Sequence, residues 1–350
     1  MDPLLPFPAL PTELVIRILH IAASTSHSSA HSISLVSTWA RRVALPYLFS
    51  TIVYRSAPSY SSGMSSGSKA SPHQRTLESR QWGSLVRSLW IQSSGINNSA
   101  NECQLLRAFY NVEHVALYST TLRSLASTIQ QYNAERRQRI ASGSTAPPPA
   151  FTNLHSITLI TNTFRYDWHF LLGLTLWDGP PLLQNITHLR IHDMTVSAFC
   201  PHNMLPNLTH LAVPFLDLGN DWKQDSSALR LPDGVLEHRA LLMLVLTVDT
   251  HKWLTNPWYQ IARYPGAGGG GPRDAESPRA MFRTLVQTAR QRDERIHVML
   301  APRLDSGGAC AEWAEAARGG ASVWEAAAIA RAENSHGAEL PETYPKVAHR

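Results

Sequence analysis

The feature that most constrains how this chain can fold is a short motif that occurs four times. Each copy reads asparagine, apolar, two polar, apolar, any residue, apolar, and the copies begin at Asn111, Asn153, Asn185 and Asn207. Three looser copies lack the asparagine and place their apolar residues at Phe49, Ile52 and Tyr54, at Val86, Leu89 and Ile91, and at Leu241, Leu244 and Leu246. The alternation that ends each copy predicts a short strand with one buried face, and the repetition predicts a stack of such strands.

Helices are expected between the strands. Leu122, Leu125 and Ile129 share one helix face within residues 121–140. A second helix is expected after Ser277 and Pro278, because a capping residue followed by proline suits a helix start. Its apolar face is formed by Phe282, Leu285, Val286 and Ala289. Strand, helix and parallel strand make a right-handed crossover, and stacked crossovers form an arc whose strands line the concave side.

We therefore predict an α/β fold in two parts. A short N-terminal helical module, residues 5–47, is followed by an irregular leucine-rich-repeat arc, residues 48–332, with parallel strands on the concave side and helices and loops outside. The arc is irregular because its copies lie 22 to 42 residues apart, whereas regular repeats of this kind take about 20–29 residues. A last strand is expected at Ile296, Val298 and Leu300. The alternative is a mixed α/β sheet whose strands happen to look alike.

Four segments have compositions that predict loops or a tail. Residues 56–75 are rich in serine, residues 141–150 contain three prolines, residues 264–279 contain five glycines, and residues 333–350 are polar. Such segments carry too little apolar surface to offset the entropy of ordering them.

Composition excludes several classes of protein. The formal charge is only +5, and the bases form no stripe interleaved with aromatic residues, which disfavours nucleic-acid binding. Cys103, Cys200 and Cys310 are too far apart for a disulfide scaffold or a zinc knuckle. The longest apolar run, residues 240–248, is half of a membrane span, and the first ten residues lack the basic start of a signal peptide. We expect a soluble protein of the cytoplasm or nucleus, with no nucleic-acid or membrane partner.

The N-terminal module is predicted from amphipathic patterns. Residues 10–22 predict a helix because Leu14, Ile18 and Ile21 fall on one face. A turn rich in serine and histidine is expected over residues 23–32, and Pro46 is expected to end the helix that follows it. The apolar residues of this second helix are Ile33, Leu35, Val36 and Trp39.

This module resembles an F-box, in which L-P-x-E-[LI]…I-L is followed roughly thirty positions later by L-V-[SC]…W. The separation of Leu10 and Trp39 fits that pattern. With an F-box-like module followed by leucine-rich repeats, the chain is similar to a large set of proteins in mushroom-forming (basidiomycete) fungi. The resemblance covers almost the whole chain. The C-terminal pattern EW…RGG…W fits that set too, as Glu312-Trp313, Arg318-Gly319-Gly320 and Trp324. One departure is that Val36 and Trp39 are three residues apart instead of four, and either spacing is expected to keep both on one helix face.

The resemblance implies a substrate-recognition subunit of an SCF ubiquitin ligase. Its F-box would dock a Skp-type adaptor, which joins a cullin and a RING protein, and its arc would hold a target protein. The adaptor-binding residues that it implies are Leu10, Pro11, Glu13, Leu14, Ile18, Leu19, Leu35, Val36 and Trp39. In the alternative, these helices only cover the apolar end of the arc, and the chain is an adaptor-independent interaction scaffold.

A target-binding surface is expected on the concave side, where the side chains that flank the buried residues of each strand should point. We predict that it prefers an acidic or aromatic peptide; the alternative is a solvated face without a ligand. The predicted residues are Trp90, His114, Tyr118, His188, Arg190, His192 and His210. The repeated asparagines are expected to hydrogen-bond the backbone of turns.

No catalytic, cofactor or metal site is predicted, and we expect a protein that is not an enzyme. Residues 63–67 match G-x-S-x-G, but they lie in a Ser/Gly-rich segment instead of a strand-to-helix elbow. Residues 266–271 lack the Gly-Lys-Ser/Thr of a phosphate-binding loop. His27 and His31 are four residues apart without a suitably spaced third ligand.

Overall fold

The chain is a mixed α/β structure built on one parallel sheet. The computed structural model describes residues 10–54, 83–92, 99–146, 149–161, 163–177, 179–194, 199–215, 229, 231–255, 278–302 and 306–335. The expected loop over residues 56–75 lies outside these ranges, as do residues 264–277 of the expected loop at 264–279 and residues 336–350 of the expected tail at 333–350. The remaining residues of these two segments, 278–279 and 333–335, are helical, contrary to the expectation. Within the ranges, no helix is long and apolar enough to cross a membrane.

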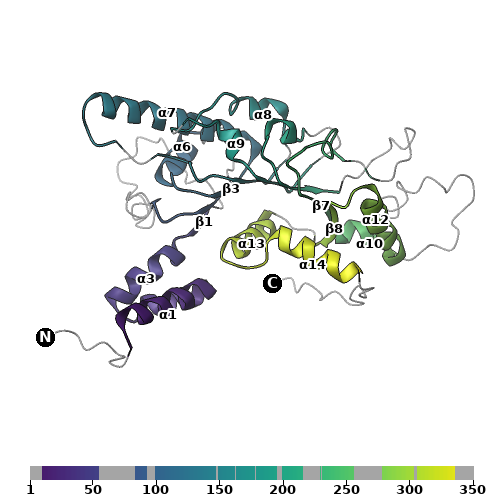
Figure 1. Ribbon diagram of the computed structural model, residues 1–350, viewed down its shortest axis with the longest axis horizontal. Helices are drawn as coiled ribbons and strands as arrows, with labels where there is room; N and C mark the ends of the chain where they lie inside the picture. Colours follow the sequence, from purple (N-terminus) through teal and green to yellow (C-terminus); the bar gives the residue numbers. More distant parts are fainter. Residues whose placement is uncertain are drawn as a thin grey trace, which may run out of the picture.

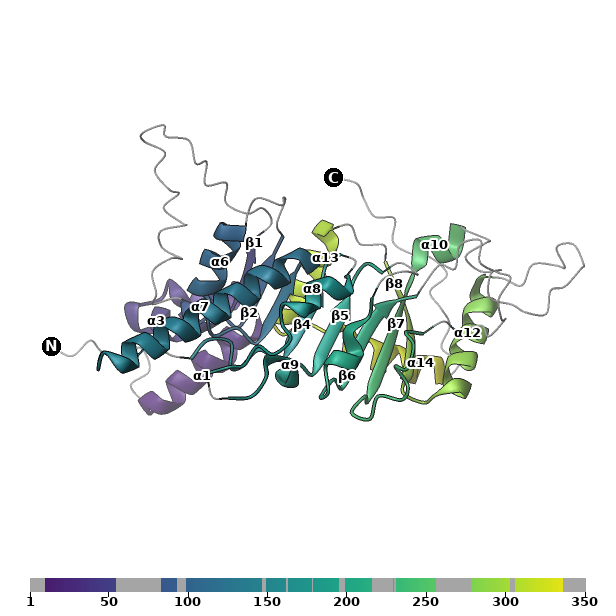
Figure 2. The same ribbon diagram turned by 90° about the horizontal axis from the view of Figure 1, so that it is seen from above.

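Eight strands pair in chain order, and every pair is parallel. They follow one another along the long axis of the molecule (Figure 2). The strands are β1 (Thr51–Tyr54), β2 (Ser88–Ile91), β3 (His114–Leu117), β4 (Ser156–Leu159), β5 (His188–Ile191), β6 (His210–Pro214), β7 (Met243–Asp249) and β8 (Ile296–Ala301). The strands predicted at the seven motif copies and at residues 296–300 are thus confirmed.

The register aligns the motif copies with one another. One row of paired residues is Leu89, Val115, Ile157, Leu189, Leu211, Leu244 and Ile296, and all seven are buried in the main core. The next row is Trp90, Ala116, Thr158, Arg190, Ala212, Val245 and His297. Because strand side chains alternate, this second row lies on the opposite face, and a slip of one residue would exchange the two rows.

Helices cover the first of these faces, which we call the outer face (Figure 1). Its elements are α6 (Ser99–Ala108), η1 (Ser119–Thr121), α7 (Leu122–Ala141), α8 (Arg165–His169), α9 (Leu182–Asn185), η2 (Pro201–Met204), α10 (Thr250–Thr255) and α12 (Pro278–Arg292). Leu122, Leu125 and Ile129 of α7 are fully buried in the same core as the strands. Phe282 and Ala289 of α12 join that core, so both helices predicted from apolar spacing are confirmed.

Three of the repeated asparagines hydrogen-bond the backbone of the preceding repeat; the acceptor lies in a turn, as predicted, for Asn111 and Asn185, and in the helix α9 (Leu182–Asn185) for Asn207. Their Nδ2 atoms donate at 2.8–3.1 Å, from Asn111 to Ser84 O, from Asn185 to Thr152 O and from Asn207 to Gln184 O. Asn153 differs, because its Nδ2 donates to the side-chain oxygen of Asn111 at 2.9 Å. The asparagines therefore link successive repeats along one edge of the sheet.

The second face of the sheet, which we call the inner face, is also covered. Two helices lie against it, α13 (Ser306–Ala317) and α14 (Val323–Ser335) (Figure 1). The expectation that helices lie only outside the arc was therefore wrong. The inner face carries large apolar side chains such as Trp90, and a chain lowers its free energy by burying them.

Three short helices precede the sheet and pack on one another: α1 (Thr12–Thr25), α2 (His27–Ser34) and α3 (Thr38–Leu48). The predicted turn over residues 23–32 is mostly helical, because the Ser26 hydroxyl caps α2 by accepting from Ser29 N–H at 3.0 Å. Ser37 caps α3 in the same way, from Ala40 N–H at 3.0 Å.

The second predicted helix is therefore divided. Leu35 and Val36 lie in the turn between α2 and α3, so Val36 and Trp39 do not share a helix face, contrary to the expectation. Pro46 does not end α3 at its own position either. It lies inside the last turn of α3, whose final bond runs from Phe49 N–H to Leu45 O at 3.0 Å. Pro46 lacks the N–H that would bond to the carbonyl four residues earlier, and α3 ends two residues after it.

Candidate functional site

The N-terminal helices expose an apolar surface. Large hydrophobic side chains are exposed at Leu10, Leu14, Ile18, Ile21, Leu35 and Val36, by 40% to 71%. Of the nine implied adaptor-binding residues, Leu19 and Trp39 are half-buried and the other seven are exposed. We call the six exposed hydrophobic residues the N-terminal apolar surface.

The local sequence explains why this surface faces solvent. In α1, Val15 and Ala23 are buried toward the neighbouring helices, which turns Leu14, Ile18 and Ile21 outward. α1 is tied to α3 by a contact of 3.1 Å between His20 Nδ1 and Tyr47 Oη. In the turn after α2, the cap at Ser37 needs an extended backbone and leaves Leu35 and Val36 unburied.

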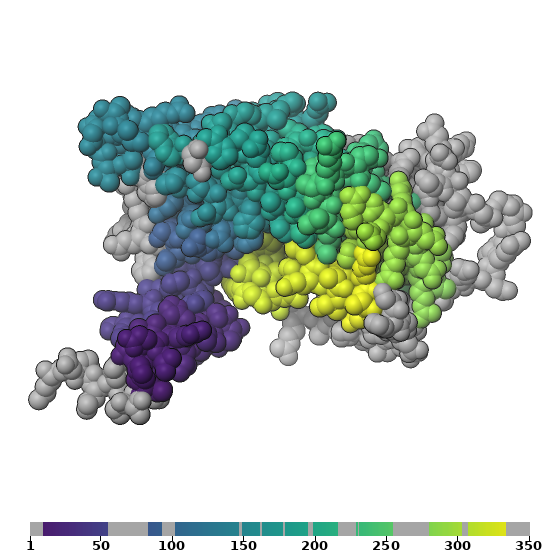
Figure 3. Space-filling model, in the orientation of Figure 1, coloured from purple at the N-terminus to yellow at the C-terminus, as the bar shows by residue number. Residues whose placement is uncertain are grey.

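These helices project from one end of the molecule, where Figure 3 shows them in purple. A cleft of about 860 Å³ separates the junction of α1 and α2 from α13. Thr25, Ser26 and His27 line one side of it, and residues of α13 with Gly319 and Gly320 line the other. The N-terminal apolar surface contributes no residue to this cleft.

On the inner face, α13 covers β1 to β5. Trp313 lies against Trp90, with ring centroids 5.6 Å apart, and both side chains are buried with Ala116, Ile160 and Cys310. The side chain of Arg190 is only 10% exposed, and its Nη2 donates to both carboxylate oxygens of Glu312 at 2.8 and 3.0 Å. A charge-assisted pair therefore fixes α13 over the middle of the sheet.

The other end of the inner face is covered by α14. Val323 and Ala327 are buried against Ala212 and Val245. At its far end α14 is held by arginines: Arg331 donates to Glu294 O, and Arg290 Nη2 donates to Arg331 O at 2.7 Å.

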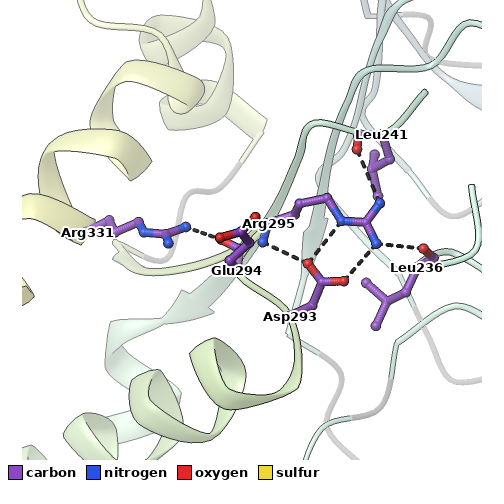
Figure 4. Close-up of polar contacts among 6 residues, drawn as sticks. All are labelled: Leu236, Leu241, Asp293, Glu294, Arg295 and Arg331. Carbon is purple, nitrogen blue, oxygen red and sulfur yellow. Dashed lines mark hydrogen bonds and ion pairs between the residues drawn. The ribbon is translucent and has the colours of Figure 1, made fainter. Parts of the chain in front are cut away.

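The residue beside Glu294 braces the start of β8 (Figure 4). Arg295 donates to Leu236 O at 2.6 Å and to Leu241 O at 3.3 Å, and it pairs with Asp293 at 2.7 Å. The hydrogen bonds that Arg295 donates to the Asp293 carboxylate hold the pKa of Asp293 below its usual range. The carbonyl that receives Arg331 thus belongs to a fixed turn.

The two glycines between α13 and α14 make the sharp return possible. Gly319 has φ of 96°, in the left-handed region that glycine adopts without strain. A Cβ on Gly320 would lie 2.9 Å from Glu315 O, so only glycine fits there without movement. The pattern EW…RGG…W therefore supplies the contacts and the turn of this cover.

Four histidines line up along the starts of the strands. Ring centroids are 4.7 Å apart for His114 and His155, 6.1 Å for His155 and His188, and 4.3 Å for His188 and His210, which are stacked. Trp324 of α14 meets His188 and His210 edge-on, at 5.6 and 5.4 Å. These rings close an aromatic row under the α13–α14 turn.

Burial favours the uncharged form of two histidines on the inner face, His188 and His192. Burial, followed by repulsion from His210, His155 and His114, lowers the pKa of His188 to about 4. Burial, with Arg190 nearby, lowers the pKa of His192 to about 3. Both rings are therefore neutral near pH 7.

None of the seven predicted target-binding residues is exposed. Trp90 and Arg190 are buried, and the other five are half-buried. A cavity of about 400 Å³ remains between the histidine row and the α13–α14 turn, lined by His114, His188, Arg190, Trp313, Trp324 and Glu325 among others. The structure thus brings the predicted residues to one face, but the chain's own C-terminal helices pack on that face. Target binding by these residues stays a prediction.

Sequence reasoning missed the residues of α13 and α14 that contact the inner face, Glu312, Trp313 and Trp324. Their signal was the pattern EW…RGG…W, which nothing in the sequence connects to the inner face. Among the described residues, no group of three or more His, Cys, Asp or Glu side chains is placed to hold a metal ion.

In comparisons with known proteins, no family model, no curated protein and no solved structure matches this chain.

Proposed function

We propose that this chain is an F-box-type substrate-recognition subunit of an SCF ubiquitin ligase. In this proposal the N-terminal helices dock a Skp-type adaptor, and the sheet belongs to an irregular leucine-rich-repeat arc that presents a target protein. The observation that carries it is the N-terminal apolar surface, with Leu14 47%, Ile18 53% and Val36 71% exposed.

Exposed apolar surface of this kind needs a reason, because burying one such side chain contributes about 1.5–3 kcal/mol. Six of them between Leu10 and Val36 make a patch that favours a protein partner over water. Three of these residues come from α1 and two from the turn after α2, and α1 packs on α2. A groove or helix on an adaptor would cover such a surface as one unit.

The alternative is an adaptor-independent scaffold whose helices only cap the arc. A cap would bury Leu14, Ile18 and Val36 against the first strand, whereas these side chains face solvent. The interpretation of the sheet as a repeat arc is supported by the aligned motif, the sequential strand order and the linked asparagines.

The test is co-purification of the full chain with a fungal Skp-type adaptor. We expect a stoichiometric complex that a Leu14→Asp/Val36→Asp variant loses. The matched control is Leu242→Asp/Leu254→Asp, because those leucines are similarly exposed, by 65% and 50%, but lie elsewhere. A folded chain that forms no complex, or a complex that both double variants lose equally, contradicts the proposal.

A further inference from the structure

A second group of exposed apolar side chains lies around α8, on the outer face. Phe164 is 60% exposed, Tyr166 65% and Leu172 48%. Elsewhere in the described residues beyond α3, the exposed large hydrophobics are Ile140, Leu242, Leu254 and Ile329. Exposed aromatic residues grouped in this way are typical of anchors at protein interfaces.

The segment that carries these side chains is held rigidly. The buried Trp168 donates from Nε1 to Thr163 Oγ1 at 2.7 Å, and the Asp167 carboxylate accepts from Phe164 N–H at 3.2 Å. Tyr166 meets Phe170 edge-on, with ring centroids 5.0 Å apart. Little conformational entropy of this surface would therefore be lost when a partner binds, which favours binding.

Arginines of α7 border the same surface. Arg123 Cζ lies 5.3 Å from the centre of the Phe170 ring, and Arg136 Cζ lies 4.7 Å from the Trp177 ring. Arg137 and Leu172 line a hollow of about 250 Å³ between α7 and the turn after α8. From Arg123 to Arg137, α7 runs about 21 Å at 1.5 Å per residue, a span that about six residues of extended peptide would cover.

The charge of this region is positive and little compensated. Residues 122–177 contain five arginines and two carboxylates. Both carboxylates are already engaged, because Glu135 pairs with Arg107 and Asp167 caps the start of α8. We call the exposed residues Arg123, Arg137, Phe164, Arg165, Tyr166 and Leu172 the α7–α8 surface.

We propose that the α7–α8 surface binds an acidic peptide segment that carries an aromatic or large aliphatic side chain. This inference rests on the proposed function and assigns the target of the ligase to the outer face, because α13 and α14 occupy the inner one. Carboxylates of the segment pair with Arg123, Arg137 and Arg165. Its apolar side chain packs between the aromatic rings of α8 and Leu172.

A single-stranded nucleic acid is the other polymer that arginines and aromatic rings bind. The peptide is favoured because Leu172 offers no stacking plane, and because the arginines of residues 122–177 do not form a continuous basic track.

The test begins with selection of random 16-residue peptides displayed on phage against the full chain. Synthetic fluorescein-labelled copies of the selected peptides are then titrated by fluorescence polarisation. We expect them to combine several Asp or Glu residues with Phe, Trp or Leu. A Phe164→Ser/Tyr166→Ser variant should bind at least about tenfold more weakly, as the loss of interface anchors does. An Arg123→Gln/Arg165→Gln variant should bind more weakly and depend less on salt. The matched control, Leu242→Ser/Ile329→Ser, should change affinity less than twofold.

Three results would overturn the proposal: no enriched peptides, peptides without acidic residues, or binding that the α7–α8 variants leave unchanged. A labelled 20-nucleotide single-stranded RNA that binds and depends on Arg123 and Arg165 would overturn it in favour of nucleic acid. Adaptor co-purification of the same variants separates the two proposals. A retained adaptor complex without peptide recognition refutes only this surface, whereas peptide recognition without an adaptor complex refutes only the ligase.

Discussion

The N-terminal helices and the inner face of the sheet treat their apolar side chains in opposite ways. Ile18 and Val36 are more than half exposed, whereas Trp90 on the inner face has no exposed surface, because α13 covers it. Both regions were expected to bind other proteins. The difference teaches that the inner face is covered by helices of the same chain, whereas the N-terminal apolar surface stays open to solvent.

The largest expected effect comes from truncating the tryptophan with which α13 packs on the inner face. We call α13 and α14 together the cover. Trp313→Ala should lower the free energy of unfolding by about 3–5 kcal/mol, because it leaves a cavity beside Trp90. Ile18→Ala is the open counterpart and should change that free energy by less than about 0.5 kcal/mol. Urea unfolding of both variants measures the contrast; similar losses would remove the distinction between the two regions.

A smaller effect is expected from the ion pair that fixes α13. Glu312→Gln should cost about 1.5–3 kcal/mol, because it leaves the buried guanidinium of Arg190 without its charged acceptor. The control is Glu113→Gln, whose partner Arg87 has a side chain 46% exposed, and it should cost about 0–1 kcal/mol. Equal losses of stability in thermal or urea unfolding would mean that the pair of Arg190 and Glu312 contributes no more than an exposed ion pair.

Acid should loosen the cover before it affects the N-terminal helices. His188, with a pKa of about 4, and His192, at about 3, lie below the ordinary 6.5, so the unfolded chain binds more protons between about pH 6.5 and 4. Stability is therefore complete above about pH 6.5 and falls as the pH drops toward 4. The titratable and charged groups that face this region are His114, His155, His210, Arg190, Glu312 and Glu325.

Hydrogen exchange of residues 306–335 at pH 7.5, 6 and 5 measures this loosening. His188→Gln should reduce the pH dependence of exchange in α14. An unchanged dependence would assign the acid response to other groups.

The smallest expected effect concerns the asparagines that link the repeats. Asn207→Ala should cost about 1 kcal/mol, the worth of one hydrogen bond to Gln184 O. Asn203→Ala, at an exposed position of the same repeat, should be nearly neutral. Equal unfolding midpoints of the two variants would mean that the hydrogen bonds of the asparagines do not contribute to stability.

Much of the sheet is predictable from the sequence because its information is local. An apolar residue at every second position marks a strand, and the repeated motif sets the register between strands. The helices at residues 122–141 and 278–292 follow from apolar spacing in the same way. Strand order then follows from the rule that successive crossovers lie side by side.

The cover was not predictable, because its contacts join distant parts of the chain. Trp90 belongs to the second strand, whereas Trp313 belongs to a helix that follows the last strand. Apolar spacing does not say which face of a sheet such a helix will choose. The division of the second helix was missed for a local reason. The cap at Ser37 outweighs the apolar pattern of residues 33–39, and capping competes with helix continuation at each serine.

The most direct test of this account is hydrogen exchange of the full chain, free and with a fungal Skp-type adaptor. The account predicts slower exchange in residues 12–36 of the complex, and unchanged exchange in residues 88–91 and 306–335. Protection of the inner face or of α14 with none in residues 12–36, or no complex with a folded chain, would contradict it.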